Sequence, residues 1–467
     1  MKRVEKRDLT TGNVTSNLIY MAMPAIFGSL AQTIYTLVDM FWIGKISASA
    51  VAAVTISSSI FFLVWILSSI IGISSVSLIS QQYGKKDIKG TEKAIEQTVV
   101  LKFIVAIITM VIMMFLLEPI VNFLTNDAVV IEKALEYSYI QLMFLPIFFS
   151  QATMTTALRC IGDSTKPMVI MMTAAVLNMV LDPILMFEVV PVVGIKGFGM
   201  GVAGAALATS LSSLVAFSIG MIVLFGGFTN VKPKLKGLFK LDKEVDKKLL
   251  TIGLPVGFEM TAREVGGLIV MKFLASYGTV VLAAVGITFR LVSFAYTIMS
   301  GLSSGGGAIV GQNLGANNVA RAEDTAYAAA KLGIMMIGSL TAIVMVAAPD
   351  IIKVFVEDPA VHSVGAVILR ITMVGATIFS IALSLSCVFT GSGYNFPYMI
   401  SSILAKWVIQ IPFLYIAIRI YNLPYYVVPI SYFLSDSVES LVLLTFFKKG
   451  VWKTFRVSEK KVEVAAD

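Results

Sequence analysis

The sequence is poor in charged residues and in the residue types that build most metal, redox and hydrolytic sites. Charged residues make up 14% of the 467 positions, and the chain has two cysteines and one histidine. With 57% hydrophobic residues and a mean hydropathy of +0.88, this composition excludes an ordinary soluble globular protein. No metal-ligand spacing or Walker loop is present in the sequence, which argues against a metalloenzyme and against ATP hydrolysis.

The remaining short motifs also give no enzyme. "GMGVAG" at 199–204 and "GLSSG" at 301–305 match a nucleotide-binding and a nucleophile motif by letters, but neither has the strand that such motifs require. His362 falls in a predicted outer region and is expected at the surface. Cys160 and Cys387 fall at predicted inner helix ends, where thiols stay reduced, so no disulfide is expected.

Long apolar segments dominate the chain. Each is about 20–30 residues long, enough at roughly 1.5 Å per residue to cross a hydrocarbon core of about 30 Å as a helix. The sequence therefore predicts an all-α polytopic membrane protein with twelve transmembrane helices, near 14–43, 48–80, 95–117, 131–157, 167–188, 201–226, 248–277, 280–310, 325–348, 362–390, 397–420 and 424–447.

The basic residues behind the net charge of +8 are unevenly distributed between the two sides of the predicted membrane. If both termini are cytoplasmic, the inner segments hold 25 of the 36 Lys and Arg residues and the outer loops hold five. This asymmetry predicts a multi-pass protein of the cell inner (plasma) membrane with both termini cytoplasmic, and it requires no nucleic-acid partner. The first apolar segment is too long for a signal-peptide core and is retained as a helix.

The two halves of the chain repeat one design. A shift of 231 residues places Pro255 on Pro24, Gln312 on Gln81 and Gly315 on Gly84. Six crossings per half predict parallel repeats, that is, two pseudo-symmetric six-helix bundles, the architecture of alternating access. The predicted boundaries are an N-terminal lobe at 1–227, a basic cytoplasmic linker at 228–247, a C-terminal lobe at 248–448 and a cytoplasmic tail at 449–467.

Two acids of the first half have no basic partner at similar depth. Asp39 and Asp182, the latter in "LNMVLDPILMF", are predicted in the outer half of the bilayer together with Thr209. Carboxylates placed there must carry protons or bind a metal cation. Snorkelling of Asp39 to the outer interface is the alternative.

The neighbours of these acids favour a small coordination site. Asn178 and Asp182 are four residues apart on one helix face, and Ala205 and Thr209 have the same spacing. Gln32, Tyr35 and Asp39 share a face of the first helix. Carboxylate, amide, hydroxyl and backbone oxygens are hard ligands that suit Na⁺, and the carboxylates can equally hold H⁺.

The second half contains both signs of charge. Its deep residues can pair among themselves, so a structural ion-pair network and a functional role both stay open. These residues are Glu259, Arg263, Glu264, Lys272, Arg290, Arg370, Lys406, Asp436 and Glu439.

Three stretches carry a specific resemblance. "MPAIFGSLAQTIYTLVDMFWIGKISASAVAAVTI", "LNMVLDPILMF" and "GVAGAALATSLSSL" resemble the first, fifth and sixth helices of the multidrug and toxic compound extrusion (MATE) family. The resemblance implies antiport of amphipathic or cationic drugs against Na⁺ or H⁺, through a V-shaped central cavity between two lobes. It also implies a cation or proton site at Asp39, Asn178, Asp182 and Thr209 with the Ala205 carbonyl, substrate contacts at Gln32, Tyr35 and Asn178, and a helix bend at Pro24.

One departure concerns the second lobe. Where some family members place an acid about eight residues after the proline, this chain has Arg263, so we expect the coupling site in the first lobe. The alternatives are a flippase of related fold for lipid or lipid-linked oligosaccharide, and a passive channel. We expect no enzyme activity and no cofactor beyond Na⁺ or H⁺. Membrane lipid and small drugs are the expected partners, and a monomer suffices.

Overall fold

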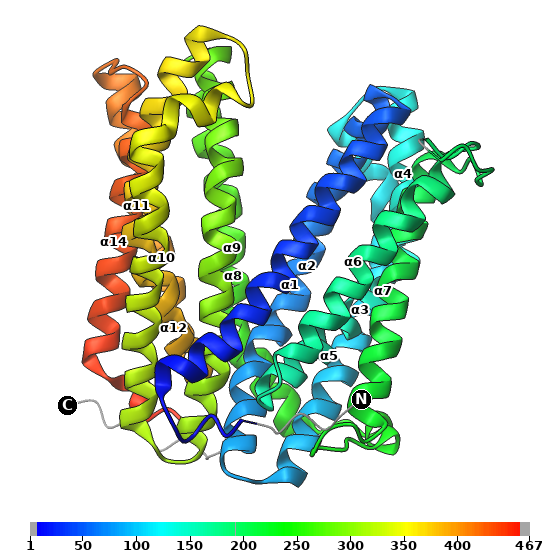
Figure 1. Cartoon of the computed structure of the whole chain (residues 1–467), viewed down its shortest axis with the longest axis vertical. Helices are drawn as coiled ribbons and strands as arrows, with labels where there is room; N and C mark the ends of the chain where they lie inside the picture. Colours follow the sequence, from blue (N-terminus) through cyan, green and yellow to red (C-terminus); the bar gives the residue numbers. More distant parts are fainter. Residues whose placement is uncertain (1–6, 192, 458–467) are drawn as a thin grey trace. The chain divides into compact units, whose positions relative to one another are not determined.

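The protein is helical throughout the part that the structure describes. A computed structural model describes residues 7–191 and 193–457 (Figure 1), and within these ranges the only β-pairing is an isolated bridge between Val189 and Lys196. This confirms the prediction of an all-α polytopic membrane protein.

The first half of the chain contains seven α-helices and the linker contains a short 3₁₀ helix. They are α1 (Val14–Ile46), α2 (Ala48–Gly84), α3 (Ile88–Leu124), α4 (Ala128–Met143), α5 (Leu145–Cys160), α6 (Thr165–Met186), α7 (Gly201–Phe225) and η1 (Leu235–Phe239). The second half contains α8 (Lys243–Ala275), α9 (Thr279–Gly315), α10 (Val319–Lys353), α11 (Pro359–Ser392), α12 (Phe396–Ile403), η2 (Leu404–Gln410), α13 (Ile411–Tyr415), η3 (Ile416–Ile420), α14 (Val427–Lys449) and η4 (Val451–Lys453).

Ten helical segments are long and apolar enough to cross a membrane, counted within the described ranges. The two remaining predicted crossings are not among these ten, each for its own physical reason. The segment predicted at 131–157 is divided into α4 and α5 at Phe144, two residues before Pro146, because proline cannot continue the helical hydrogen bonding. Helix α8 is long enough, but it carries the charged residues Glu259, Arg263 and Glu264 close together.

Several helices extend beyond their apolar segments because polar caps start them outside the predicted span. The side chains of Asp87, Asn318 and Asp358 accept backbone hydrogen bonds at the starts of α3, α10 and α11. The segment predicted at 397–420 is one run in which η2 and η3 are π-helical turns, a form often found near functional sites.

The chain divides into two compact units, each described here by itself. The first bundle comprises residues 27–79 and 87–253. The second bundle comprises, among the described residues, 7–26, 80–86 and 254–457. Of the three boundaries in the first half, two fall inside helices, in α1 and α2, and the third falls between α2 and α3.

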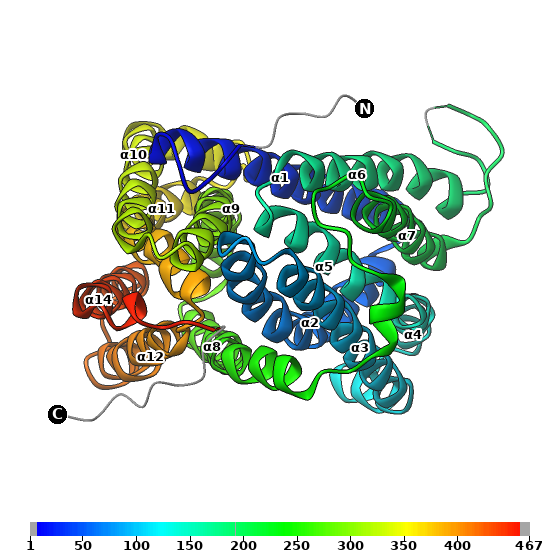
Figure 2. The same ribbon diagram turned by 90° about the horizontal axis from the view of Figure 1, so that it is seen from below.

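Within the first bundle, α6 and α7 lie side by side in both views (Figures 1 and 2). Gly204 permits this approach: a Cβ there would lie 2.6 Å from the carbonyl oxygen of Leu185. A larger residue would separate the two helices. This close packing brings side chains of α6 within reach of side chains of α7.

The basic linker is bound to α3. The backbone N–H of Lys232 donates to Glu92 Oε1 (3.0 Å), and that of Asp242 donates to Gln97 Oε1 (2.9 Å). Lys93 forms an ion pair with Asp242. The linker therefore has a fixed path along the first turns of α3.

In the second bundle, the repeat predicted from the sequence is visible at a helix crossing. Gly84 of α2 packs against the carbonyl group of Gln312, and Gly315 of α9 packs against the carbonyl group of Gln81. The 231-residue shift superposes Gly84 on Gly315 and Gln81 on Gln312. The two contacts are therefore equivalent: in each, the glycine of one repeat meets the glutamine of the other. Gln81 also donates from Nε2 to the carbonyl oxygens of Gly391 and Ser392, each at 3.0 Å.

Candidate functional site

The two acids singled out from the first half are buried inside the first bundle. Asp39 of α1 is 8% exposed and Asp182 of α6 is 0% exposed, and Asn178, one turn before Asp182, is 1% exposed. Neither carboxylate has an ion-pair partner among the described residues. Burying such groups without a countercharge is costly, so their neighbours decide what they can do.

Asn178 connects three of the predicted residues. Its Nδ2 donates to Asp182 Oδ1 and to Thr209 Oγ1, each at 3.2 Å. The spacing of four residues on α6 accounts for the first contact, and the close packing of α6 on α7 accounts for the second. The structure thus brings Asn178, Asp182 and Thr209 into one cluster.

Besides the hydroxyl of Ser212, three carboxylate or amide oxygens in this region are buried without a hydrogen-bond donor. They are Asp39 Oδ1, Asn178 Oδ1 and Asp182 Oδ2. Buried acceptors are nearly always satisfied in folded proteins, so oxygens left without a donor point to a missing proton, cation or water. Their chemistry, two carboxylates and an amide, is that of hard ligands.

A cavity of about 340 Å³ lies next to this cluster, entirely within the first bundle. Asp39, Asn178 and Thr209 line it, together with the predicted substrate residues Gln32 and Tyr35. This volume lies in the range of pockets that hold small organic ligands. Acidic oxygens and space for a ligand therefore occur together.

Two predicted residues lie elsewhere. Ala205 is buried one turn before Thr209 in an apolar cluster with Ile43 and Val54, and its role as a carbonyl ligand stays a prediction. Pro24 lies inside α1, which continues as a helix through it, and belongs to the second bundle. The predicted bend there also stays a prediction.

Other polar residues of the cavity were missed from the sequence. Gln141 and Tyr137 of α4 line it, and Gln141 Nε2 donates to Tyr137 Oη (2.9 Å). Gln151 of α5 and Ser212 of α7 line it as well. Amides inside the apolar 131–157 segment were the available signal, because such groups rarely face lipid.

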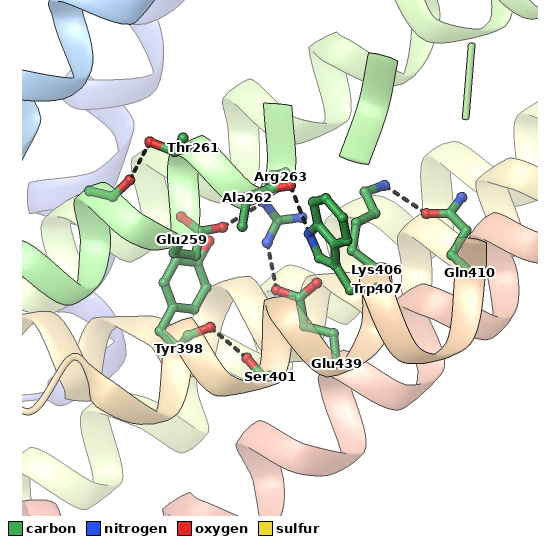
Figure 3. A network of polar contacts seen from close by, with 11 residues as sticks. Glu259, Thr261, Ala262, Arg263, Tyr398, Ser401, Lys406, Trp407, Gln410 and Glu439 are labelled. Carbon is green, nitrogen blue, oxygen red and sulfur yellow. Dashed lines mark hydrogen bonds and ion pairs between the residues drawn. The ribbon is translucent and has the colours of Figure 1, made fainter. Parts of the chain in front are cut away.

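The second bundle contains a separate polar network (Figure 3). Arg263 of α8 donates from Nε to Glu259 Oε1 (2.6 Å) and from Nη2 to Glu439 Oε1 (2.7 Å) of α14. Glu259 and Glu439 are 2% and 1% exposed. The expectation that charges of the second half pair with each other is therefore met for these three residues, while Glu264 is exposed.

Among the described residues, no Lys or Arg of the first bundle forms an ion pair with Asp39 or Asp182. Lys166 pairs with Asp163 (2.6 Å). Lys102 of α3 is 2% exposed and lies against α2 at Gly72, where a Cβ would be 3.1 Å from its Nζ. Within the described part of the chain, no group of three or more His, Cys, Asp or Glu side chains could hold a metal ion.

These features define the class of protein: a multi-pass helical membrane protein with acidic residues at a cavity inside one of its two bundles. The MatE family model matches residues 24–184 and 255–416, once in each half. The chain belongs to the MatE family, as the sequence resemblance had indicated.

Relatives resemble the chain over most of its length. A probable multidrug resistance protein, YpnP, of Bacillus subtilis (strain 168) is 28% identical over 412 residues, which cover 87% of this chain and 89% of its own. The multidrug export protein MepA of Staphylococcus haemolyticus (strain JCSC1435) is 26% identical over 411 residues, 87% of each chain.

Solved structures share the fold. A multidrug resistance MATE family transporter of the MOP superfamily in an outward-facing conformation matches with a TM-score of 0.88 and 23% identity, over 96% of this chain and 98% of its own. A MOP superfamily transporter from Pyrococcus furiosus, described as having a binding pocket of reverse polarity that suggests a different function, matches with a TM-score of 0.87 and 22% identity, over 96% and 98% of the two chains.

Proposed function

We propose that this protein is a secondary active multidrug exporter that antiports amphipathic or cationic organic compounds against Na⁺ or H⁺ by alternating access. One observation carries the proposal: buried oxygens of Asp39 and Asn178 without donors lie at a cavity in the first bundle, and Asp182, bound to Asn178, adds a third such oxygen. The names of relatives such as MepA, a multidrug export protein, support the substrate class.

The proposed mechanism is a linkage between ion and drug at one site. A proton or Na⁺ that neutralises Asp39 and Asp182 removes the negative charge that would attract a cationic compound into the cavity. Binding of the ion and binding of the drug therefore oppose each other. If the two lobe arrangements differ in affinity for each ligand, ion entry drives drug exit.

The oxygens of Asp39 and of the cluster formed by Asn178, Asp182 and Thr209 suit the proposed ion. Asp39 Oδ1, Asn178 Oδ1 and Asp182 Oδ2 have free acceptor capacity, and Thr209 adds a hydroxyl oxygen. A proton needs only one carboxylate, whereas Na⁺ needs several oxygens at once. The orientation that we propose, with both termini cytoplasmic in the plasma membrane, follows the distribution of Lys and Arg.

The test is efflux of a fluorescent cationic dye from reconstituted vesicles under an imposed Na⁺ or H⁺ gradient. We expect gradient-driven efflux in the parent and its loss in both Asp39→Asn and Asp182→Asn, since amides keep the size and remove the charge. The gradient that supports efflux identifies the ion. Glu118→Gln is the matched control, because Glu118 is an exposed acid of α3 outside the cavity.

Three outcomes would contradict the proposal. Undiminished efflux in both variants would refute the assignment of the coupling site. Absence of dye movement in the parent, combined with transfer of a labelled lipid between leaflets, would favour the flippase alternative, and dye movement without any gradient coupling would favour a channel.

A further inference from the structure

The buried charges of the second bundle do not cancel. Three acids, Glu259, Asp436 and Glu439, are 2%, 8% and 1% exposed, and they share their surroundings with two bases, Arg263 and Lys406. If all five are ionised, one negative charge remains. Uncompensated charge at membrane depth is costly and marks a functional group, so it matters which acid carries the excess.

Both glutamates are bound by the same arginine, which offsets one of their two negative charges. The guanidinium of Arg263 donates to Glu259 at 2.6 Å and to Glu439 at 2.7 Å (Figure 3). Such charge-assisted hydrogen bonds are among the strongest in proteins. These two contacts hold both glutamates in place, since each accepts a hydrogen bond from the same guanidinium group.

Lys406 is committed to other partners. Its Nζ donates to Gln410 Oε1 (2.8 Å) and lies 4.9 Å from the centre of the Tyr432 ring. Gln410 in turn donates from Nε2 to Ser431 Oγ (3.2 Å). No ion pair joins Lys406 to a carboxylate among the described residues, so its charge acts on Asp436 only at longer range.

Asp436 is the acid of the three that has no direct partner among the described residues. It makes no hydrogen bond and no ion pair with another described residue. Gly375 of α11 leaves the room that its carboxyl group occupies, since a Cβ there would lie 3.0 Å from Asp436 Oδ2. The ionisable groups that act on it are Arg263 from α8, Tyr296 from α9, Lys406 from η2, and Tyr432 and Glu439 from α14.

We propose that Asp436 is a proton-binding site of the second bundle, separate from the acids of the first bundle. A proton from water converts its carboxylate to the neutral acid and cancels the excess charge of the cluster, and its release restores that charge. Na⁺ does not fit here, because a metal cation needs several oxygens and Lys406 would repel it. The use of this proton as a second coupling ion rests on the proposed transport function; the site itself does not.

Infrared difference spectroscopy tests the site without any transport assay. The full chain carrying Asp39→Asn and Asp182→Asn is reconstituted in liposomes, and spectra at near-neutral and alkaline pH are subtracted. Exposed carboxyls, with ordinary pKa values of roughly 4, are ionised at both pH values. We expect a C=O band of a protonated carboxyl group that disappears at the higher pH, and its complete loss when Asp436→Asn is added.

The control and a second variant keep the test decisive. Glu264→Gln, which changes the exposed acid next to Arg263, should leave the band in place. Lys406→Met should make the band persist to higher pH, because a nearby positive charge that favours the carboxylate has been removed. Absence of any band before Asp436 is changed, a band that survives Asp436→Asn, or an unmoved band in Lys406→Met would each overturn the proposal.

The coupling role has its own measurement. In vesicles where the parent exports dye, Asp436→Asn should lower the number of protons moved per dye molecule. An unchanged ratio would refute the coupling role. A parent that exports no dye would refute the transport function and leave the infrared result standing.

Discussion

Asn178 donates a hydrogen bond from Nδ2 to Oδ1 of Asp182, one turn further along α6, at 3.2 Å. The same amide group also donates to Thr209 of α7, also at 3.2 Å. The bonds orient Asn178 so that its Oδ1 and the other carboxylate oxygen of Asp182 stay without donors. Helix α6 thus leaves two buried acceptor oxygens available to a proton or a cation.

Thr209→Val tests the α7 side of this cluster. Valine keeps the shape of threonine but removes the hydroxyl acceptor of Asn178 and one oxygen of the cluster. A hydrogen bond of this kind contributes about 0.5–1.5 kcal/mol, so we expect the Na⁺ or H⁺ concentration for half-maximal dye efflux to rise roughly 2- to 10-fold. Ion titration of efflux in vesicles measures it.

Thr173→Val is the control for this substitution. Thr173 lies on the same helix as Asn178, and its hydroxyl donates only to Val169 of its own helix (2.8 Å). We expect no change there. A shift of equal size in both variants would show that the effect is one of general helix packing and would contradict a specific role for Thr209.

Gly84→Ala should strongly destabilise the second bundle. A Cβ at Gly84 would overlap the carbonyl group of Gln312, a backbone atom that cannot move away cheaply. Overpacking of this kind typically costs about 1–3 kcal/mol. Thermal melting of the purified protein in detergent should show a lower Tm.

Gly286→Ala is the matched control for that change. Gly286 also lies inside a long helix, α9, but a Cβ there has nothing within 4 Å. Alanine should therefore leave Tm unchanged or raise it, because the helix propensity of alanine is more favourable than that of glycine by about 0.5–1 kcal/mol. An equal fall in Tm in the two variants would show that the contact between Gly84 and Gln312 is not the cause.

Arg263→Met should leave Glu259 and Glu439 buried without their shared cation. Removing one partner of a buried ion pair costs up to about 3–5 kcal/mol. We expect a large fall in Tm, partly recovered when Glu439→Gln is added, because one of the two stranded charges then disappears. Arg290→Met, at an exposed arginine of α9, should have little effect. A double variant no more stable than Arg263→Met alone would contradict the pairing.

The linker should loosen at low pH through Asp242. The hydrogen bond from Lys93, aided by the backbone N–H groups of Val245 and Glu244, lowers the pKa of Asp242 below its usual value. The folded pKa is below the unfolded value of roughly 3.9, so this contribution to stability is present above that pH and is lost as pH falls through the folded pKa. Asp242→Asn should remove it at neutral pH.

Melting curves at several pH values check the linker prediction. The Tm difference between the parent and Asp242→Asn should shrink below about pH 4. Glu357→Gln, which changes an exposed acid between α10 and α11, should show no such pH-dependent difference. A difference that stays constant down to the lowest pH would contradict the role of the carboxylate.

The sequence predicted the crossings because apolar runs of this length have one stable form in a membrane. It could not predict that α4 and α5 break at Phe144, or that the run after Phe396 contains two π-helical turns, since hydropathy does not register local hydrogen bonding. It also placed the starts of several helices too late, because N-caps such as Asp87 lie outside the apolar part.

The candidate site was predictable where it depends on spacing within one helix. Asn178 and Asp182 illustrate this, being four residues apart. Partners brought together by tertiary packing were not predictable: Arg263 and Glu439 are 176 positions apart, and Gln141 reaches the cavity from another helix. Which acid pairs with which base is decided by helix packing that periodicity does not specify.

Drug-driven ion movement is the measurement that shows whether the acids of the first bundle exchange a coupling ion for drug. A cationic dye gradient is imposed across reconstituted vesicles with no initial ion gradient, while a trapped pH indicator and radioactive sodium report the ions. We expect H⁺ or Na⁺ movement opposite to the dye in the parent, and none in Asp39→Asn or Asp182→Asn. Equal counter-movement of the ion in the parent and in both variants would contradict it.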